Sequence, residues 1–319
     1  MRFWLLLAAV LAMPAFAQPA KVYRIGMLEV TPESANRTNL NAFLQGMREA
    51  GYTEGQNFII DYRSVDGRPD RFAKLAAELV AAKADIIVTR STPAALAAKK
   101  AGSVPVVMAS SADPVAYGVV ASLAHPGGNV TGLCTMVSDL AAKRLQLLKE
   151  LVPEATRIAA PLDLSHPTAA EERRQLETAA KSLGLQAIVL DVRDAQGLER
   201  ALKEALAERA DALLVNAEVV VMGNRDLIID FARKHRLPVM YAAREHVEAG
   251  GLIAYGVNYP HLYYRAASYV DKILKGANPG DLPIEKPMKL NLILNIRAAT
   301  ALDIPIPSKL LFRVDELIR

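Results

Sequence analysis

The stretch ADIIVTRSTP, residues 84–93, decides the fold that the sequence predicts. Asp85 to Thr89 is a short run with a wholly apolar centre, which is typical of a strand covered on both faces of a parallel sheet. Thr92 is a good N-cap and Pro93 a good first helical residue, so an alanine-rich helix should follow at once and run to Ala101. A strand that leads directly into a helix is half of a βαβ unit.

The same alternation continues along the chain in both directions. Strands are expected near 23–30, 57–63, 104–109, 158–162, 186–191, 212–216 and 238–241, and helices near 39–50, 69–82, 169–183, 197–208 and 224–235. Strands that alternate with helices of this length predict doubly wound parallel sheets and an α/β fold class. Ala84-Asp85 before one strand is echoed by Ala210-Asp211 before another, which indicates either two similar α/β lobes or merely two βαβ units.

Three extended runs follow turn residues and are interpreted as crossings between two lobes. The turns are at 126–129, 250–251 and 281–283. We expect hinge strands near 130–136, 248–257 and 282–290. This division places 21–132 plus 250–280 in lobe 1, and 133–249 plus 281–319 in lobe 2.

The first residues are typical of an export signal. Phe3 to Met13 is too short an apolar run to span a bilayer, and Ala15-Phe16-Ala17 suits a signal peptidase. We expect residues 1–17 to be removed and the mature protein to be periplasmic, without a lipid anchor because no cysteine lies near the cleavage point. The alternative is a buried N-terminal helix.

Composition excludes several classes of protein. Of 319 residues, 52% are hydrophobic and 23% charged, so the chain is neither disordered nor a disulfide miniprotein. The net charge of +4 is spread along the chain, which argues against a nucleic-acid partner. Cys134 is the single cysteine, so no internal disulfide can form.

Catalytic and cofactor motifs are missing from the sequence. There is no G-x-G-x-x-G, P-loop, G-x-S-x-G or H-E-x-x-H, so we expect no cofactor, no metal and no enzyme activity. Glu245-His246 with Glu248 is interpreted as a solvated loop, and residues 171–174 as a solvated helix face. A nucleophilic pair of Cys134 with a histidine is the weaker alternative.

Two strand ends carry the best candidates for a ligand site. The pairs Thr92-Pro93 and Asp113-Pro114 each combine a capping residue with a proline, where ligands bind in open parallel sheets. Free N–H groups and the helix dipole at such a point favour an anion. Asp113 and Glu29 could instead hold a cationic group, and the alternative for Thr92 and Asp113 is that they only cap helices.

Several stretches of the chain match a known family in order. They include residues 46–57, 67–71, 92–95, 113–115, 126–132, 143–153 and 250–256. On these residues the chain resembles the ABC transporter substrate-binding protein family, whose members include predicted tryptophan- and tyrosine-type binding proteins. The resemblance implies a type I periplasmic-binding-protein fold with three hinge strands, a ligand cleft between the lobes and a membrane permease as a transient partner. Aromatic-amino-acid binders of this family tend to have an Asp-Asn-type pair where this chain has residues 215–218, VNAE.

These observations predict a monomer that binds a small, amino-acid-like solute. The candidate ligand-binding residues are Glu29, Ser91, Thr92, Pro93, Ala94, Ser110, Ser111, Asp113, Met136, Asn216, Glu218, Tyr241 and Glu245. The solute's carboxylate is expected at the helix that begins at Thr92-Pro93. Arg90 is expected in an exposed salt bridge at the rim, and the alternative is that it adds positive charge to the carboxylate site. Asp113 and Glu245 are candidates for an ammonium group, and Tyr241 or Met136 for apolar packing. The alternatives are a sensory ligand-binding module and a hydrolase on the same fold.

Overall fold

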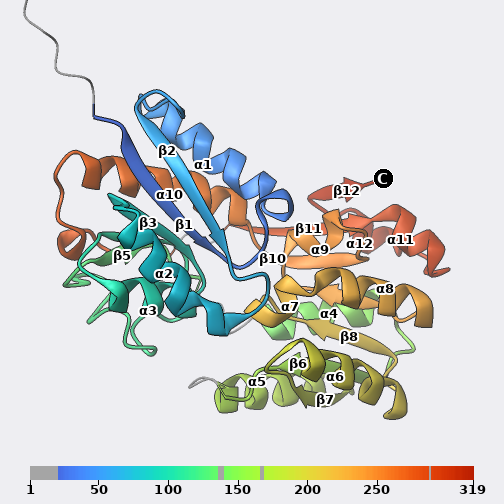
Figure 1. The fold of residues 1–319 in the computed structure, drawn as a ribbon. Coiled ribbons are helices and arrows are strands. Elements are labelled where there is room, and N and C mark those ends of the chain that lie inside the picture. Colours follow the sequence, from blue (N-terminus) through green and yellow to red (C-terminus); the bar gives the residue numbers. More distant parts are fainter. Residues whose placement is uncertain (1–20, 136–139, 166–168, 287–288) are drawn as a thin grey trace, which may run out of the picture.

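The protein is described by a computed structural model that covers residues 21–135, 140–165, 169–286 and 289–319. These residues form two α/β lobes, each built on its own sheet (Figure 1). The predicted leader, residues 1–17, and the candidate residue Met136 lie outside the described residues. Among the described residues, no helix combines the length and the apolar character needed to cross a membrane.

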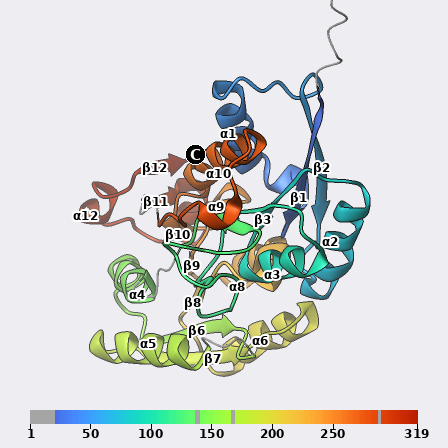
Figure 2. The ribbon, with the colours of Figure 1, turned by 90° about the vertical axis from the view of Figure 1, so that its left-hand side faces the viewer.

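The first sheet has the strand order β2-β1-β3-β4-β5, and all its pairs are parallel. Its strands are β1 (Tyr23–Glu29), β2 (Phe58–Ser64), β3 (Ile86–Arg90), β4 (Val106–Ser110) and β5 (Val130–Gly132). The helices of this lobe are α1 (Arg37–Glu49), α2 (Phe72–Ala81), α3 (Thr92–Ala101) and α10 (Tyr259–Leu274), with short 3₁₀ turns η1 (Glu33–Ala35), η2 (Pro69–Arg71) and η3 (Pro279–Asp281). Helices α1 and α10 lie on one face of the sheet, and α2 and α3 on the other (Figures 1 and 2).

The second sheet has the order β12-β11-β10-β9-β8-β6-β7. Its strands are β6 (Arg157–Leu162), β7 (Gln186–Asp191), β8 (Ala212–Val215), β9 (Val239–Tyr241), β10 (Ile253–Val257), β11 (Leu290–Asn295) and β12 (Glu316–Ile318). Its helices are α4 (Leu140–Leu151), α5 (Ala169–Ser182), α6 (Ala195–Ala207), α7 (Val219–Gly223), α8 (Arg225–His235), α9 (Arg244–Glu248), α11 (Ile296–Ala301) and α12 (Ser308–Leu311). Only the β10–β11 pair is antiparallel among the described strands. Two apolar clusters cover the sheet, one containing residues of α6 to α9 and the other residues of α4, α5, α11 and α12.

The two sheets repeat one topology. In the first sheet the strands lie side by side in the order second, first, third, fourth, fifth (β2-β1-β3-β4-β5). If the strands of the second sheet are counted from β6, its strands β7-β6-β8-β9-β10 have the same order. The repeated Ala-Asp pairs have matching roles, since Asp85 accepts a hydrogen bond from Arg24 N at the start of β1, and Asp211 accepts one from Arg157 N at the start of β6. The interpretation of two similar lobes is therefore confirmed.

Helix α10 completes the first lobe although it follows most of the second lobe in the sequence. Phe43 and Met47 of α1 are fully buried in the core that α10 helps to form. A Cβ atom at Gly46 would lie 2.7 Å from the Tyr264 carbonyl oxygen, so glycine allows the two helix backbones to approach closely.

The crossings between the lobes differ in detail from the prediction. Strand β10 belongs to the second sheet, so the expected lobe 1 range 250–280 is wrong for residues 253–257. The first hinge strand ends at Gly132 and not near 136, and β11 begins only at Leu290. A parallel bridge joins Leu133 to Glu285, so two of the crossings lie side by side.

Candidate functional site

A cavity of about 770 Å³ lies between the two lobes, at the carboxyl ends of strands from both sheets. From the first lobe, the residues that follow β1, β3 and β4 line it: Val30, Arg90–Pro93 and Ser110–Asp113. From the second lobe it is lined by Ala160 and Leu162 of β6, by residues 216–219 after β8, and by Ala242 after β9. The site therefore sits at the switch points of two doubly wound sheets, where such folds bind ligands.

The structure brings eight of the predicted residues together around this cavity. They are Ser91, Thr92, Pro93, Ser110, Ser111, Asp113, Asn216 and Glu218. Ala94 is fully buried in the first turn of α3 and does not line the cavity. Glu29, Tyr241 and Glu245 are also absent from its lining, and their predicted contacts with a ligand do not agree with the structure.

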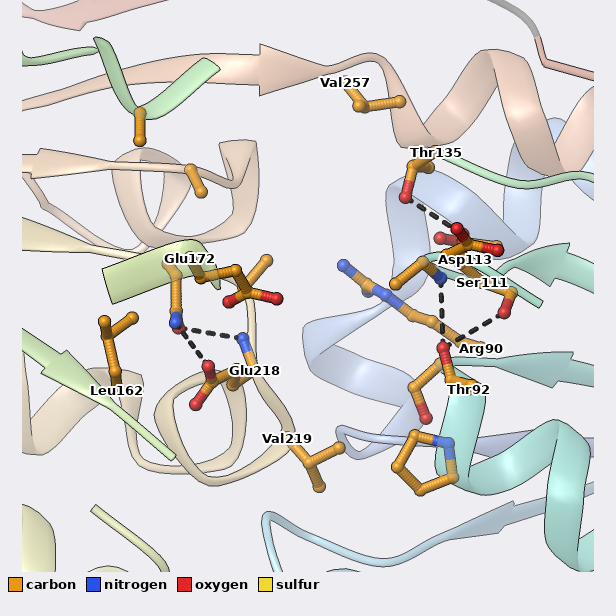
Figure 3. A pocket seen from close by; sticks show the side chains of 18 of the residues that line it. Arg90, Thr92, Ser111, Asp113, Thr135, Leu162, Glu172, Glu218, Val219 and Val257 are labelled. Carbon is orange, nitrogen blue, oxygen red and sulfur yellow. Dashed lines mark hydrogen bonds between the residues drawn. The ribbon is translucent and has the colours of Figure 1, made fainter. Parts of the chain in front are cut away.

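The start of α3 differs by one residue from the prediction. The N-cap is Ser91, whose hydroxyl accepts a hydrogen bond from Ala94 N at 3.3 Å, and Thr92 is already helical. The Thr92 hydroxyl lies 3.0 Å from that of Ser111 and accepts from Ala112 N, as Figure 3 shows. These bonds tie the loops after β3 and β4 into one wall of the cavity.

Ser91 has a backbone conformation that is strained for any residue with a side chain. Its φ is 91° and its ψ is 154°, a region that is essentially restricted to glycine. It directly follows a shift in the register between β3 and β4, which lies at Thr89 and Arg90. Strain and irregular pairing both fall at the cavity wall, where they fix the direction of the neighbouring side chains.

We expect Ser91→Gly to raise the free energy of unfolding by about 1 kcal/mol, because relief of strain exceeds the small cost of exchanging a serine cap for glycine. Ser91→Ala keeps the strain and loses the cap, so it should lower that free energy by about 1 kcal/mol. Urea unfolding of the two variants measures both values. A glycine variant that is less stable than the alanine variant would show that Ser91 is unstrained.

Asp113 caps a turn and not the helix that its Asp-Pro sequence predicts. Its Oδ1 accepts hydrogen bonds from Val115 N and Ala116 N, each at 3.0 Å. The turn ends at Gly118, whose φ is +67°, before a helix can form. Asp113 lines the cavity, but the helix dipole expected behind it is missing.

Arg90 and Glu245 form a buried ion pair that joins the lobes. Their Nη1 and Oε1 atoms are 2.7 Å apart, and their side chains are only 4% and 3% exposed. The expected exposed salt bridge at the rim is therefore wrong. The expected solvated loop is wrong for Glu245 and His246, which are buried in the short helix α9, whereas Glu248 of the same helix is exposed. Asn39 of α1 also donates a hydrogen bond to Glu245 Oε1 at 2.8 Å. Glu245 Oε1 is thus occupied by protein partners, whereas Oε2 is buried without a hydrogen-bond partner among the described residues.

Glu29 and Tyr241 are buried inside the lobes, where their side chains contact other protein side chains. Both carboxylate oxygens of Glu29 accept from the Tyr263 hydroxyl, at 2.7 and 2.8 Å, and burial raises the pKa of Glu29 to about 7 although the charge of Arg90 opposes this. Tyr241 stacks on His246 with ring centroids 4.6 Å apart. Burial lowers the pKa of His246 to about 4, so this ring is neutral at pH 7.

The wall from the second lobe carries the carboxyl groups of Glu218 and Glu172 as well as Arg144. Glu218 accepts hydrogen bonds from Asn216 Nδ2 at 2.7 Å and from Asp163 N at 3.0 Å. Burial, together with the nearby charge of Glu172, raises the pKa of Glu218 to about 8. In Figure 3, Glu172 of α5 lies on this wall, opposite Arg90.

Several residues that line the cavity were not among the predicted ligand-binding residues, and the charged and aromatic ones among them include Arg90, Arg144, Glu172 and Tyr259. Arg90 had a usable signal, because it ends a buried strand directly before the predicted site. Glu172 stands among charges typical of a solvated face, and nothing local distinguishes it. Arg144 and Tyr259 reach the cavity from α4 and α10, which only the tertiary fold places there.

The comparisons with known proteins agree with this architecture. The family described as ABC transporter substrate binding protein matches residues 25–318. A tyrosine-binding protein of Clostridioides difficile is 26% identical over 284 residues, which are 89% of this chain and 81% of that protein.

Two solved structures are similar over the same length. A conserved domain protein from Vibrio cholerae has a TM-score of 0.83 at 27% identity and covers 93% of this chain and 100% of its own. An ABC domain in complex with L-Trp from Streptococcus pneumoniae has a TM-score of 0.82 at 25% identity, with the same coverage. The predicted two-lobe fold of type I periplasmic binding proteins is confirmed. Because the family match spans nearly all of the described structure, the chain belongs to the ABC transporter substrate-binding protein family.

Proposed function

We propose that this protein is the periplasmic solute-binding component of an ABC importer and that it captures an amino-acid-like solute between its lobes. The observation that carries the solute class is that the cavity lining holds groups of both charges. The first lobe offers hydroxyl donors at Thr92 and Ser111, the guanidinium of Arg90 and the carboxylate of Asp113. The second lobe offers the carboxylates of Glu218 and Glu172 and the guanidinium of Arg144. A solute with a carboxylate at one end and an ammonium group at the other fits this combination of charges.

Three further observations support the proposal. The cavity volume lies within the range usual for small-molecule sites. Tyr117 and Tyr259 supply aromatic surface in the lining. The Clostridioides difficile relative is a tyrosine-binding protein, and the Streptococcus pneumoniae structure holds L-Trp. The predicted leader supports export, and family membership supports delivery of the solute to a membrane permease.

A thermal-shift screen tests the solute class, with L-tyrosine and L-tryptophan first and other amino acids, neutral sugars and nucleosides after them. At about 100 times Kd, a ligand adds roughly 2.7 kcal/mol to the free energy of unfolding, which for a chain of this size is a rise of about 5–10 °C in Tm. L-Tyrosinamide should shift Tm less than L-tyrosine. A clear shift with sugars alone would overturn the amino-acid assignment, and product formation during binding would indicate an enzyme.

The affinity for L-tyrosine or L-tryptophan should rise with pH through the pKa of Glu218. Because that pKa is raised to about 8, the carboxyl group is mostly protonated at pH 6 and must lose its proton to pair with an ammonium group. Affinity should therefore increase roughly tenfold or more between pH 6 and pH 8. Calorimetry in buffers of different ionisation enthalpy measures both the affinity and the released proton.

Glu218→Gln is the matched control, since the amide cannot titrate. Its affinity should be flat over this pH range and its binding should release no proton from this site. If the wild-type protein also has a flat profile, Glu218 is not the partner of the ammonium group.

A further inference from the structure

Two arginines from different lobes face the same cavity. Arg90 ends β3 in the first lobe, and Arg144 lies in α4 of the second. Both line the cavity. Among the described residues, one arginine has an N–H group without a hydrogen-bond partner, and the other has no carboxylate to balance its charge. From the sequence, Arg90 was only the alternative source of positive charge at the carboxylate site, and Arg144 was not expected there.

Arg90 has one occupied edge and one free one. Its Nη1 donates to Asn36 Oδ1 at 3.3 Å and pairs with Glu245. Its Nη2 is buried and has no hydrogen-bond partner among the described residues. Arg90 as a whole is only 3% exposed, and in Figure 3 its guanidinium projects into the space between the two walls. A buried charged donor without a partner is costly, and a ligand oxygen that reaches Nη2 after a small shift of the surrounding side chains would remove that cost.

Arg144 lacks a counter-ion within the part of the chain that the structure describes. Its Nε donates to the Tyr255 carbonyl oxygen at 2.7 Å, but no described carboxylate lies within ion-pair distance. Burial lowers the pKa of Arg144 to about 10, and only the neighbouring tyrosines oppose the shift. This arginine has lost water without gaining a negative charge, which an anionic ligand would supply.

Tyr259 packs against Arg90 and lies within electrostatic reach of Arg144. It is the first residue of α10, and its ring lies under Arg90 with the guanidinium carbon 4.3 Å from the ring centroid. The charges of both arginines also act on its buried hydroxyl. Arg90 and Arg144 therefore belong to one local environment and not to opposite ends of the cavity.

We propose that Arg90 and Arg144, together with Tyr259, form an anion subsite that binds the carboxylate of the solute. The proposal rests on the proposed function for the solute class and adds where its anionic end is held. The start of α3 has fewer groups that are free to bind a carboxylate, because the Ser91 hydroxyl and Ala94 N are already hydrogen-bonded to each other. Since the arginines come from different lobes, one carboxylate between them would bridge the lobes and favour the closed form.

The test compares Arg144→Gln with Arg265→Gln, a matched control whose arginine is paired with Glu285 and does not line the cavity. L-Tyrosine should bind Arg144→Gln roughly tenfold or more weakly, whereas L-tyrosinamide should bind both variants like the wild type. The Tm of unliganded Arg144→Gln should be unchanged or higher, because an uncompensated charge has been removed. A merely structural role for Arg144 would lower that Tm. Arg144→Lys should recover part of the affinity.

The outcomes separate this proposal from the proposed function. If Ser91→Ala/Thr92→Ala removes the preference for L-tyrosine over its amide and Arg144→Gln keeps it, the carboxylate lies at α3 and the arginine subsite is overturned. If the wild-type protein binds no amino acid, the proposed function fails and sodium sulfate, compared with sodium chloride at equal ionic strength, tests the subsite alone. A sulfate-dependent rise in Tm in wild type and Arg265→Gln but not in Arg144→Gln supports it. Equal shifts in all three proteins, or none in the wild type, overturn it.

Discussion

Gly223→Ala is expected to weaken solute binding by roughly 5- to 150-fold, because the added methyl group collides with the opposite lobe. A Cβ atom at Gly223 would lie 2.1 Å from Gly67 Cα and 2.3 Å from Gly67 N. These are backbone atoms and cannot rotate away, so the lobes themselves must separate. Overpacking of this kind costs about 1–3 kcal/mol. If the solute binds to the arrangement of the lobes in which Gly67 and Gly223 touch, this cost lowers the apparent affinity by the factor given.

Calorimetry and small-angle scattering together check this expectation. The radius of gyration of Gly223→Ala with saturating L-tyrosine should stay above that of the liganded wild type. Gly102→Ala is the control, since a Cβ atom there meets nothing closer than Val80 Cγ1 at 3.6 Å. Wild-type affinity and radius in the Gly223 variant would mean that binding does not require contact between Gly67 and Gly223.

Glu245→Gln should lower the free energy of unfolding by about 3–5 kcal/mol, since it leaves the buried Arg90 guanidinium without its carboxylate partner. At pH 8 the loss in the free energy of unfolding should lie near the lower end of this range. There Glu29, whose pKa is about 7, is ionised and can take over part of the compensation near Arg90. Lowering the pH through 7 protonates Glu29, so the variant should lose further stability relative to the wild type. Urea unfolding at pH 8 and pH 6 measures both effects.

Glu248→Gln is the matched control on the same helix. Glu248 pairs with Arg244 at 2.6 Å, but its side chain is 30% exposed, and pairs near the surface contribute about 1 kcal/mol or less. If the two variants are equally stable, the Arg90–Glu245 pair contributes no more than a surface pair.

The alternation of strands and helices could be predicted because each element is encoded locally. Apolar strand centres such as residues 86–88 and the amphipathic face of α2 need no knowledge of the rest of the chain. Turn chemistry was less reliable, since the cap and proline at Asp113-Pro114 predict a helix but Gly118 ends the turn first.

The site was predictable where it follows directly from a strand end and not where it depends on contacts between lobes. Ser91, Thr92 and Ser111 come straight after β3 and β4, so parallel-sheet geometry places them at the cavity. Glu245 sits in a charged sequence that looks solvated, and only its distant partners Arg90 and Asn39 show why it is buried. Charge pairing across the fold leaves no periodic pattern in the sequence.

The position of α10 determines when the first lobe can fold during synthesis. Helix α1 is made early, but α10, which packs against it, emerges only after β6 to β10. Until then α1 covers that face of the first sheet without α10, and the contact between α1 and α10 must close a loop that contains most of the second lobe. Such long-range contacts slow folding. The sequence predicts an export leader. For an exported chain, the late contact between α1 and α10 keeps the first lobe unfolded, and therefore able to pass through a membrane channel, until most of the polypeptide has been synthesised.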